Sequence, residues 1–146
     1  HKAQRKQLGK RYNRILSHCA LQFAMKLQQS SLEGSNTFTA CGEGYVDVNG
    51  KRYTTNVAVL PRLLLPEWTA ATFETLTEAD FARLAELAPE ILLIGTGKTL
   101  RFPAPALLQP LMAARIGFEV MDTHAACRTY SILVAEGRKV AAAILI

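Results

Sequence analysis

The sequence has no long hydrophobic run and no cysteine spacing typical of a disulfide framework or a zinc site. No stretch approaches the roughly 18 apolar residues of a membrane span, although 49% of the 146 residues are hydrophobic. The three cysteines are Cys19, Cys41 and Cys127. An odd number at long spacings argues against a disulfide framework and against zinc, which needs paired short spacings. We therefore expect a reducing compartment, no transmembrane segment, no metal and no cofactor.

The glycines of a nucleotide-binding loop are also missing. The segment 95–99, Gly-Thr-Gly-Lys-Thr, has the composition of a phosphate loop. A phosphate loop requires a further glycine five residues before Gly97, where the chain has Leu92. A dinucleotide fingerprint requires glycine at position 100, which is Leu100. The spacing therefore excludes both kinds of nucleotide site.

Acidic residues are absent from the first 24 positions, and this absence explains the net charge of +5. Six basic residues lie there, and the remaining chain has eleven basic against twelve acidic residues, a net charge of −1. A nucleic-acid-binding domain carries its basic charge on the folded face. We predict a basic, poorly ordered extension over 1–24 and a single domain over 25–146 that does not bind nucleic acid.

The extension has three interpretations, which the sequence leaves open. Its arginine-rich, acid-free composition fits a mitochondrial transit peptide, and equally a basic arm that contacts nucleic acid or anionic lipid. The third interpretation is that Met25 is the native start. A secretory signal is excluded, because an apolar core of about 7–15 residues is missing. We expect a cytoplasmic protein, or a mitochondrial one if the extension is a transit peptide.

In the first half of the domain, the sequence predicts short strands and one helix. Asn49-Gly50 is a strong signal for a two-residue hairpin turn. Residues 61–76 predict an irregular segment in which Trp68 covers the core. Thr77 and Asp80 have the spacing of an approximate capping box. The predicted elements are strands over 37–41, 45–48, 51–54 and 56–60, and a helix from Thr77 that ends before Pro89, with Leu76 and Phe81 as its hydrophobic staple.

The last third alternates strands and helices with short links. Ile91–Ile94 is a continuous apolar run, typical of a strand covered on both faces. Such alternation argues for an α/β fold with a parallel segment, and the N-terminal antiparallel hairpins make the central sheet mixed. The predicted elements are strands 91–94, 118–121 and 139–146, a helix from Pro103 or Pro105 to Gly117, and a helix from Asp122 or Thr123 to Gly137.

A candidate pocket lies where strands 91–94 and 118–121 end. Ligands of open α/β sheets prefer the carboxyl edge of parallel strands, and a helix N-terminus favours an anion. The alternative is that the glycines only permit a tight turn and that Arg101 pairs with a carboxylate. The candidate residues are Gly95, Thr96, Gly97, Lys98 and Arg101 from one loop, and Thr123 and His124 from the helix start.

One helix face carries a possible thiol site. His124, Cys127 and Ser131 lie at helical spacing, so they share a face. A Cys–His pair can make a reactive thiolate. The alternative is that Cys127 is a small buried side chain packed beside Tyr130. Cys41, in its strand, has no predicted role.

These residues carry a family resemblance. The chain resembles a family of small domains of unknown function that includes bacterial proteins and the mitochondrial complex I assembly factor 3, over roughly 25–146. Two positions depart from the family form, His124 where glycine is common and Ser131 where asparagine is common, and the imidazole would narrow a pocket. The residues that carry the resemblance are 94–97, Arg101, 117–123, 125–130 and 136–143.

The resemblance implies a three-layer α/β domain around a mixed sheet. For the mitochondrial relatives it implies an assembly role that acts through protein partners, without known catalysis. We therefore predict a bacterial-type, non-enzymatic interaction module whose partners include respiratory complex subunits. The alternative is a small-molecule-binding protein or enzyme that uses Lys98, Arg101, Thr123 and Cys127.

Overall fold

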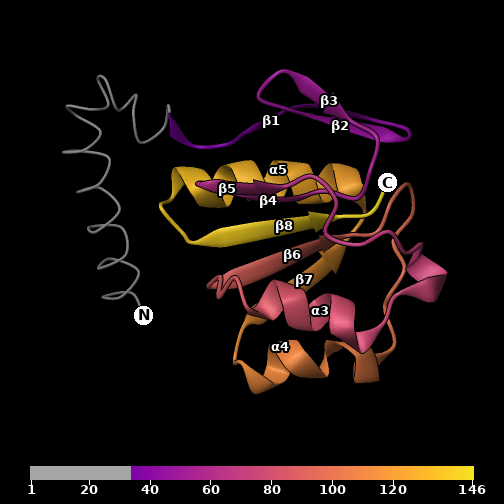
Figure 1. Ribbon diagram of the computed structural model, residues 1–146. Coiled ribbons are helices and arrows are strands. Elements are labelled where there is room, and N and C mark those ends of the chain that lie inside the picture. The colour runs from indigo at the N-terminus through magenta and orange to yellow at the C-terminus, as the bar shows by residue number, and fades with distance from the viewer. Residues whose placement is uncertain (1–33) are drawn as a thin grey trace.

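The computed structural model describes residues 34–146 (Figure 1). The predictions for 1–24 and for Met25 lie outside these residues. The described elements, in chain order, are β1 (Phe38–Gly42), β2 (Tyr45–Val48), β3 (Lys51–Tyr53), β4 (Ala58–Leu60), β5 (Leu63–Leu65), the 3-10 turn η3 (Phe73–Thr75), α3 (Glu78–Ala85), β6 (Ile91–Gly95), the 3-10 turn η4 (Pro105–Leu108), α4 (Gln109–Ala113), β7 (Gly117–Met121), α5 (Thr123–Ala135) and β8 (Val140–Ile144).

The strands form two sheets. The five-stranded sheet has the order β5-β4-β8-β6-β7, and the three-stranded sheet has the order β1-β2-β3. Strand β6 runs parallel to both β7 and β8, with Ile91 opposite Gly117 and Val140. Strand β4 is antiparallel to β5 and β8. The mixed sheet with a parallel segment is confirmed. The first hairpins form a sheet of their own, and only the β4–β5 hairpin joins the mixed sheet.

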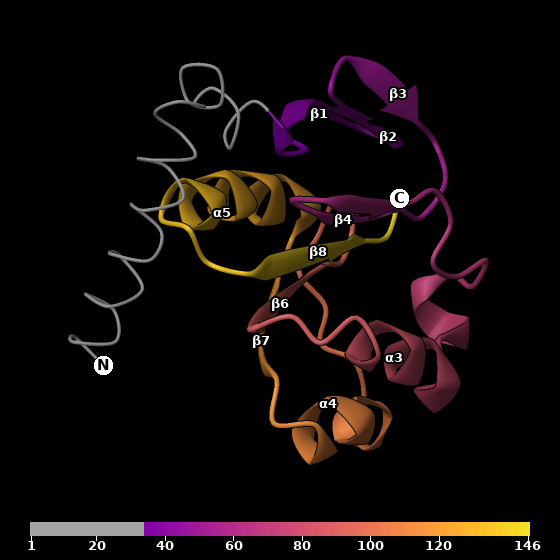
Figure 2. The ribbon, with the colours of Figure 1, turned by 60° about the vertical axis from the view of Figure 1, so that its left-hand side comes forward.

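The strand period of two separates the core into two halves. Leu92 and Ile94 of β6 pack on the side of α3 and α4, whereas Leu93 packs with Tyr130 of α5. Figures 1 and 2 show the resulting layers: α3 and α4 cover one face of the mixed sheet, and α5 with β1–β3 covers the other. The predicted three-layer α/β architecture is confirmed.

The tight turn between β2 and β3 follows the prediction. Asn49 has a φ of 54° and Gly50 a φ of 83°. A two-residue hairpin of the type that matches strand twist needs positive φ at both positions, which asparagine and glycine tolerate. The side chain of Asn49 also accepts a hydrogen bond from the Thr37 backbone N–H at 3.0 Å. This contact joins the turn to the segment that precedes β1.

Two predicted elements differ from the structure. Residues 63–65 form an edge strand, because the run between Pro61 and Pro66 pairs with β4. The helix predicted from Pro103 or Pro105 to Gly117 is shorter. Pro110 is accepted only in the first turn of a helix, so α4 starts at Gln109 behind a 3-10 turn. The chain leaves α4 through Arg115, whose φ is 56°, and Gly117 already belongs to β7.

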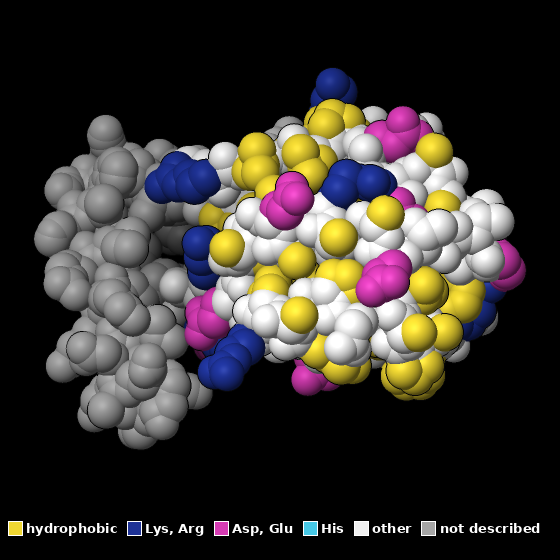
Figure 3. All heavy atoms as spheres, turned by 60° about the horizontal axis from the view of Figure 1, so that its bottom comes forward, with side chains coloured by type: hydrophobic (Ala, Val, Ile, Leu, Met, Phe, Trp, Pro, Cys, Tyr) yellow, Lys and Arg dark blue, Asp and Glu magenta, His cyan; other side chains and the backbone are white. Residues whose placement is uncertain are grey.

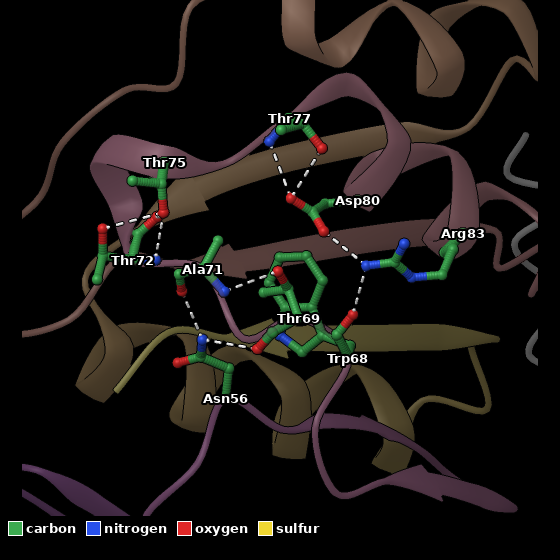
Figure 4. Close-up of polar contacts among 9 residues, drawn as sticks. All are labelled: Asn56, Trp68, Thr69, Ala71, Thr72, Thr75, Thr77, Asp80 and Arg83. Atoms are coloured by element: carbon green, nitrogen blue, oxygen red, sulfur yellow. Dashed lines mark hydrogen bonds and ion pairs between the residues drawn. The ribbon is translucent and has the colours of Figure 1, made fainter.

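The segment between β5 and α3 is fixed by side chains from both sides (Figure 4). The amide of Asn56 donates to the carbonyls of Thr69 at 2.9 Å and Ala71 at 2.8 Å. Arg83 donates to the Trp68 carbonyl at 3.0 Å, and the buried Trp68 indole donates to the Ile144 carbonyl at 3.1 Å. Trp68 therefore covers the core as predicted. The hydrogen bonds fix the backbone conformation of residues 68–71.

Asp80 is the buried centre of this network. Its carboxylate accepts hydrogen bonds from the Thr77 backbone N–H at 2.8 Å and from Arg83 at 2.6 Å. The predicted capping box is confirmed. Burial opposes ionisation, but the hydrogen bonds from Thr77, Thr69 and Arg83 outweigh it, so the pKa of Asp80 lies below its ordinary value.

We expect the free energy of unfolding to depend on Asp80 at acid pH. Because the folded pKa is the lower one, the ionised carboxyl stabilises the fold above the unfolded value of about 4. This contribution is lost as the pH falls through the folded pKa. Urea unfolding at neutral and acid pH is expected to show a smaller acid loss in Asp80→Asn than in the natural protein. Glu86→Gln, at the exposed end of the same helix, is the control and is expected to keep the full acid loss.

Candidate functional site

A cleft of about 930 Å³ opens beside the carboxyl ends of β6 and β7. It is lined there by the start of α5 and by the residues that follow β8. Its other walls come from the β1–β2 turn, residues 54–56 and residues 70–74. Of the candidate pocket residues, the cleft is lined by Thr96, Gly97, Lys98, Arg101, Thr123 and His124. Gly95 and Cys127 are not among its lining residues.

Thr96 holds the loop after β6 in shape. Its side chain is buried, and its hydroxyl donates to the Thr99 carbonyl at 2.7 Å. The same hydroxyl accepts from the Arg101 backbone N–H at 3.1 Å. The Thr96 backbone N–H donates to the Met121 carbonyl at 2.9 Å, which continues the parallel pairing beyond the strands. The hydroxyl is thus committed to the backbone of its own loop.

Thr123 joins three segments at the base of the cleft. Its buried hydroxyl accepts from the Gly97 backbone N–H at 2.9 Å and donates to the Leu145 carbonyl at 3.2 Å. Its own backbone N–H donates to the Gly97 carbonyl at 2.9 Å. The loop after β6, the start of α5 and the end of β8 are therefore fixed together by one side chain.

Gly95 permits the close approach of α5 to the sheet. A Cβ at this position would lie 2.9 Å from the Ile144 Cδ1 and 3.1 Å from the Thr123 Oγ1. It would also lie 3.2 Å from the Ala126 Cβ. Such distances are tighter than ordinary van der Waals contacts, and larger side chains in a packed core cost stability. The glycine serves helix packing below the cleft rather than its lining.

Both candidate cations of the pocket are paired. Lys98 forms an ion pair with Glu43 at 3.1 Å. Arg101 pairs with Glu74 at 2.6 Å and lies over the Phe73 ring, 4.3 Å from its centroid. The backbone N–H of Glu74 and the guanidinium of Arg101 lower the pKa of Glu74. These pairs are exposed, so each contributes little stability, but they balance the positive charge in the cleft.

The helix N-terminus at the cleft already carries a carboxylate. Asp122 precedes α5, and its side chain accepts a hydrogen bond from the Ala125 backbone N–H at 2.9 Å. An acidic residue at this position interacts favourably with the helix dipole. It occupies one of the free N–H groups and opposes a second negative charge. Binding of a small anion stays a prediction, and this geometry works against it.

The predicted thiol site is divided between two environments. His124 is exposed, whereas Cys127 is buried. Burial raises the pKa of the Cys127 thiol, and the neighbouring Cys41 thiol raises it further. The Ser131 hydroxyl donates to the Cys127 carbonyl at 3.2 Å. A reactive thiolate on Cys127 is therefore disfavoured, and the environment supports the packing interpretation.

Several cleft residues had no signal in the sequence. Glu43 and Cys41 reach the cleft from the small sheet, and Phe73 and Glu74 reach it from the segment before α3. Within residues 34–146, no group of three or more His, Cys, Asp or Glu side chains is placed to hold a metal ion. No helix in this part of the chain is long and apolar enough to span a membrane.

A family match accounts for almost all of the described chain. Residues 38–145 match the family described as "Protein of unknown function (DUF498/DUF598)". The chain belongs to the DUF498/DUF598 family. The predicted resemblance is confirmed.

Curated relatives of this DUF498/DUF598 protein include assembly factors. It is 30% identical over 122 residues to NADH dehydrogenase [ubiquinone] 1 alpha subcomplex assembly factor 3 of Xenopus tropicalis, covering 82% of this chain and 66% of the relative. It is 33% identical over 100 residues to the protein of the same name in Homo sapiens, covering 67% and 54%. The chain thus spans about half to two thirds of these relatives.

Solved structures of similar proteins share the fold of this DUF498/DUF598 chain. A crystal structure of a Bordetella parapertussis protein is 42% identical, with a TM-score of 0.72, and the match covers 77% of this chain and 96% of that one. A solution structure from Bordetella pertussis, titled a Mth938-like domain, is 34% identical with a TM-score of 0.68, and covers 80% and 87%. Both are consistent with the α/β architecture described above.

Proposed function

We propose that this protein is a non-enzymatic interaction module that assists the assembly of a respiratory complex I. The observation that carries the proposal is a group of exposed apolar side chains between β6 and β7. The assembly-factor relatives named above support the same role. The respiratory subunits are the proposed partners, and the bacterial cytoplasm is the proposed compartment. A mitochondrial location would apply if residues 1–24 are a transit peptide.

The apolar surface consists of the exposed side chains of residues 100–114, other than Arg101. No charged residue lies between Arg101 and Arg115. The exposed fractions are 50% for Leu100, 70% for Phe102 and 46% for Met112. Figure 3 views the molecule from the side of α3 and α4, where hydrophobic side chains are spread over the face and charged ones occur singly. Exposed apolar side chains that come from one short segment favour a protein contact when a partner buries them together.

The inner side chains of the same segment explain why the outer ones stay exposed. Leu108 and Leu111 are buried in the core beneath α3 and the mixed sheet. One helical turn can bury only one face, so Met112 and its neighbouring alanines point outward. Burial of Phe102 in a partner would remove a large apolar ring from water, which is favourable by roughly 1.5–3 kcal/mol.

The ligand-binding alternative has less support from the cleft. The hydroxyls of Thr96 and Thr123 are bonded to the backbone, and Lys98 and Arg101 are paired with carboxylates. An enzymatic role would need groups free to act on a substrate. The interaction module is therefore the function that the described residues support best.

Charge introduced on the apolar surface is expected to abolish partner binding. We predict that Phe102→Glu combined with Met112→Glu lowers the recovery of complex I subunits in a crosslinking pull-down by about tenfold or more, a loss of about 1.4 kcal/mol or more. Buried charges without partners are costly in an interface. The fold should persist, because both side chains are exposed in the isolated chain.

Ile132→Glu provides the matched control. Ile132 is 58% exposed and lies on α5, in the opposite layer. This variant is expected to recover complex I subunits at the natural level. Equal recovery by both variants, with thermal midpoints unchanged, would remove the apolar surface from the proposal. Absence of complex I subunits from the natural protein's pull-down would contradict the proposed partner.

A further inference from the structure

Two cysteines from different elements face each other beside the cleft. Cys41 lies on β1 of the small sheet, and Cys127 lies on α5. Both are free cysteines. The Cys41 side chain packs against the buried cluster that contains Cys127, and β1 and α5 are in direct contact. The proximity of two thiols that are far apart in sequence is the observation from which the inference starts.

An irregularity in β1 places Cys41 toward α5. The pairing of β1 with β2 shifts register between Phe38 and Ala40. In a regular strand, the side chains of Phe38 and Cys41 would point to opposite faces of the sheet. The extra residue that β1 contains between Phe38 and Ala40 brings both side chains to the same face. The Phe38 ring packs edge-on against Tyr130 with centroids 5.1 Å apart. Tyr130 and Cys127 are one helical turn apart, so β1 contacts α5 at two successive turns.

The two thiols differ in access to solvent. Cys41 is half-buried and lines the cleft, whereas Cys127 is 6% exposed. A small oxidant that enters the cleft therefore meets Cys41 first. Cys127 lies behind it, in a position to react with an oxidised Cys41 rather than with the oxidant itself. This order of access is typical of an attacking and a resolving thiol.

We propose that Cys41 and Cys127 are a modification site, at which hydrogen peroxide converts the two thiols into a reversible disulfide. The Cys41 sulfur attacks peroxide, the O–O bond breaks, and a sulfenic acid and one water form. The Cys127 thiol, which is not ionised beforehand, then attacks the Cys41 sulfur, and its proton passes to the departing hydroxyl group, which leaves as a second water. Two thiols lose two electrons in total, and one peroxide is reduced to two waters.

The disulfide would connect the small sheet to α5. In the reduced protein this connection depends on packing, chiefly that of Phe38 on Tyr130. The covalent link would fix the cleft wall that carries Glu43, and with it the ion pair from Glu43 to Lys98. It would also close a long loop of the unfolded chain, which raises stability. The oxidised protein is therefore expected to have a higher thermal midpoint than the reduced one.

The test uses the full chain with Cys19→Ser, which leaves only the two cysteines in question. After hydrogen peroxide treatment, intact mass is expected to fall by two hydrogen atoms, and iodoacetamide added to the urea-unfolded protein is expected to label neither thiol. Peptide mapping without reductant should recover a Cys41–Cys127 linked pair. Dithiothreitol should restore the mass, both labels and the original thermal midpoint. The same chain with Cys41→Ser as well should show no mass loss.

Three results would overturn the proposal. Oxygen adducts on Cys41 without a linked peptide would show that Cys127 does not resolve the sulfenic acid. Linkage between two chains would show that the partner thiol lies outside the molecule. A linked peptide with a thermal midpoint below that of the reduced protein would show that the bond requires distortion of the fold. None of these readouts depends on binding to complex I subunits.

Discussion

Replacement of Phe81 by alanine is expected to lower the free energy of unfolding by about 3–5 kcal/mol. Phe81 is fully buried on α3. Its ring packs against Trp68, with centroids 6.1 Å apart, and the buried Leu76 precedes the helix as its staple. Alanine would remove apolar surface and leave a cavity where α3, the segment behind Trp68 and the mixed sheet meet. Urea denaturation at neutral pH measures the loss.

Phe81→Leu separates cavity formation from loss of the ring. Leucine retains most of the buried volume, so we expect a loss of less than about 1.5 kcal/mol. Trp68 fluorescence reports on the same contact, because this is the only tryptophan of the chain. A loss below about 1 kcal/mol for the alanine variant would mean that Phe81 is not part of the close-packed core.

Thr123→Val is expected to lower the free energy of unfolding by about 2–4 kcal/mol, although the two side chains have almost the same shape. The hydroxyl of Thr123 serves the Gly97 N–H and the Leu145 carbonyl. Valine leaves the Leu145 carbonyl without its partner in a buried position and the Gly97 N–H without its partner in a partly buried one. The cost arises from two unsatisfied polar groups and not from lost volume.

Amide hydrogen exchange distinguishes this cause from general destabilisation. The Gly97 N–H should exchange faster in Thr123→Val under conditions in which the α3 amides keep their protection. Thr123→Ser keeps the hydroxyl and loses one methyl group, so its stability should fall by only about 1 kcal/mol. Equal losses in the serine and valine variants would assign the effect to the methyl group instead.

The sequence predicted the elements whose signals are local. The apolar run at Ile91–Ile94, the capping pair Thr77 and Asp80, and the Asn49-Gly50 turn each depend on a few adjacent residues. The parallel pairing of β6 with β7 followed from the short links between alternating strands and helices. The length of α4 was harder to predict, because Pro110 sets the start of this helix within a segment whose hydrophobic spacing continues through it.

The cleft could be predicted only in part, because half of its wall comes from distant segments. The loop after β6 and the start of α5 were found from the rule for parallel sheet edges. Glu43, Glu74 and Cys41 reach the same place through tertiary packing, and no local pattern encodes this. The face on which Cys41 lies depends on one register shift in β1. A prediction from strict alternation along the strand would have placed the Cys41 side chain on the wrong face.

The central position of β8 has a consequence for the biosynthesis of the protein. All five residues of β8 are buried, and the strand lies between β4 and β6. The β4–β5 pair and the β6–β7 pair cannot join until residue 144 has left the ribosomal tunnel. Until then, a nascent chain exposes two incomplete apolar layers, so its final collapse must follow translation of this segment, and exposed apolar surface of this kind is prone to aggregation.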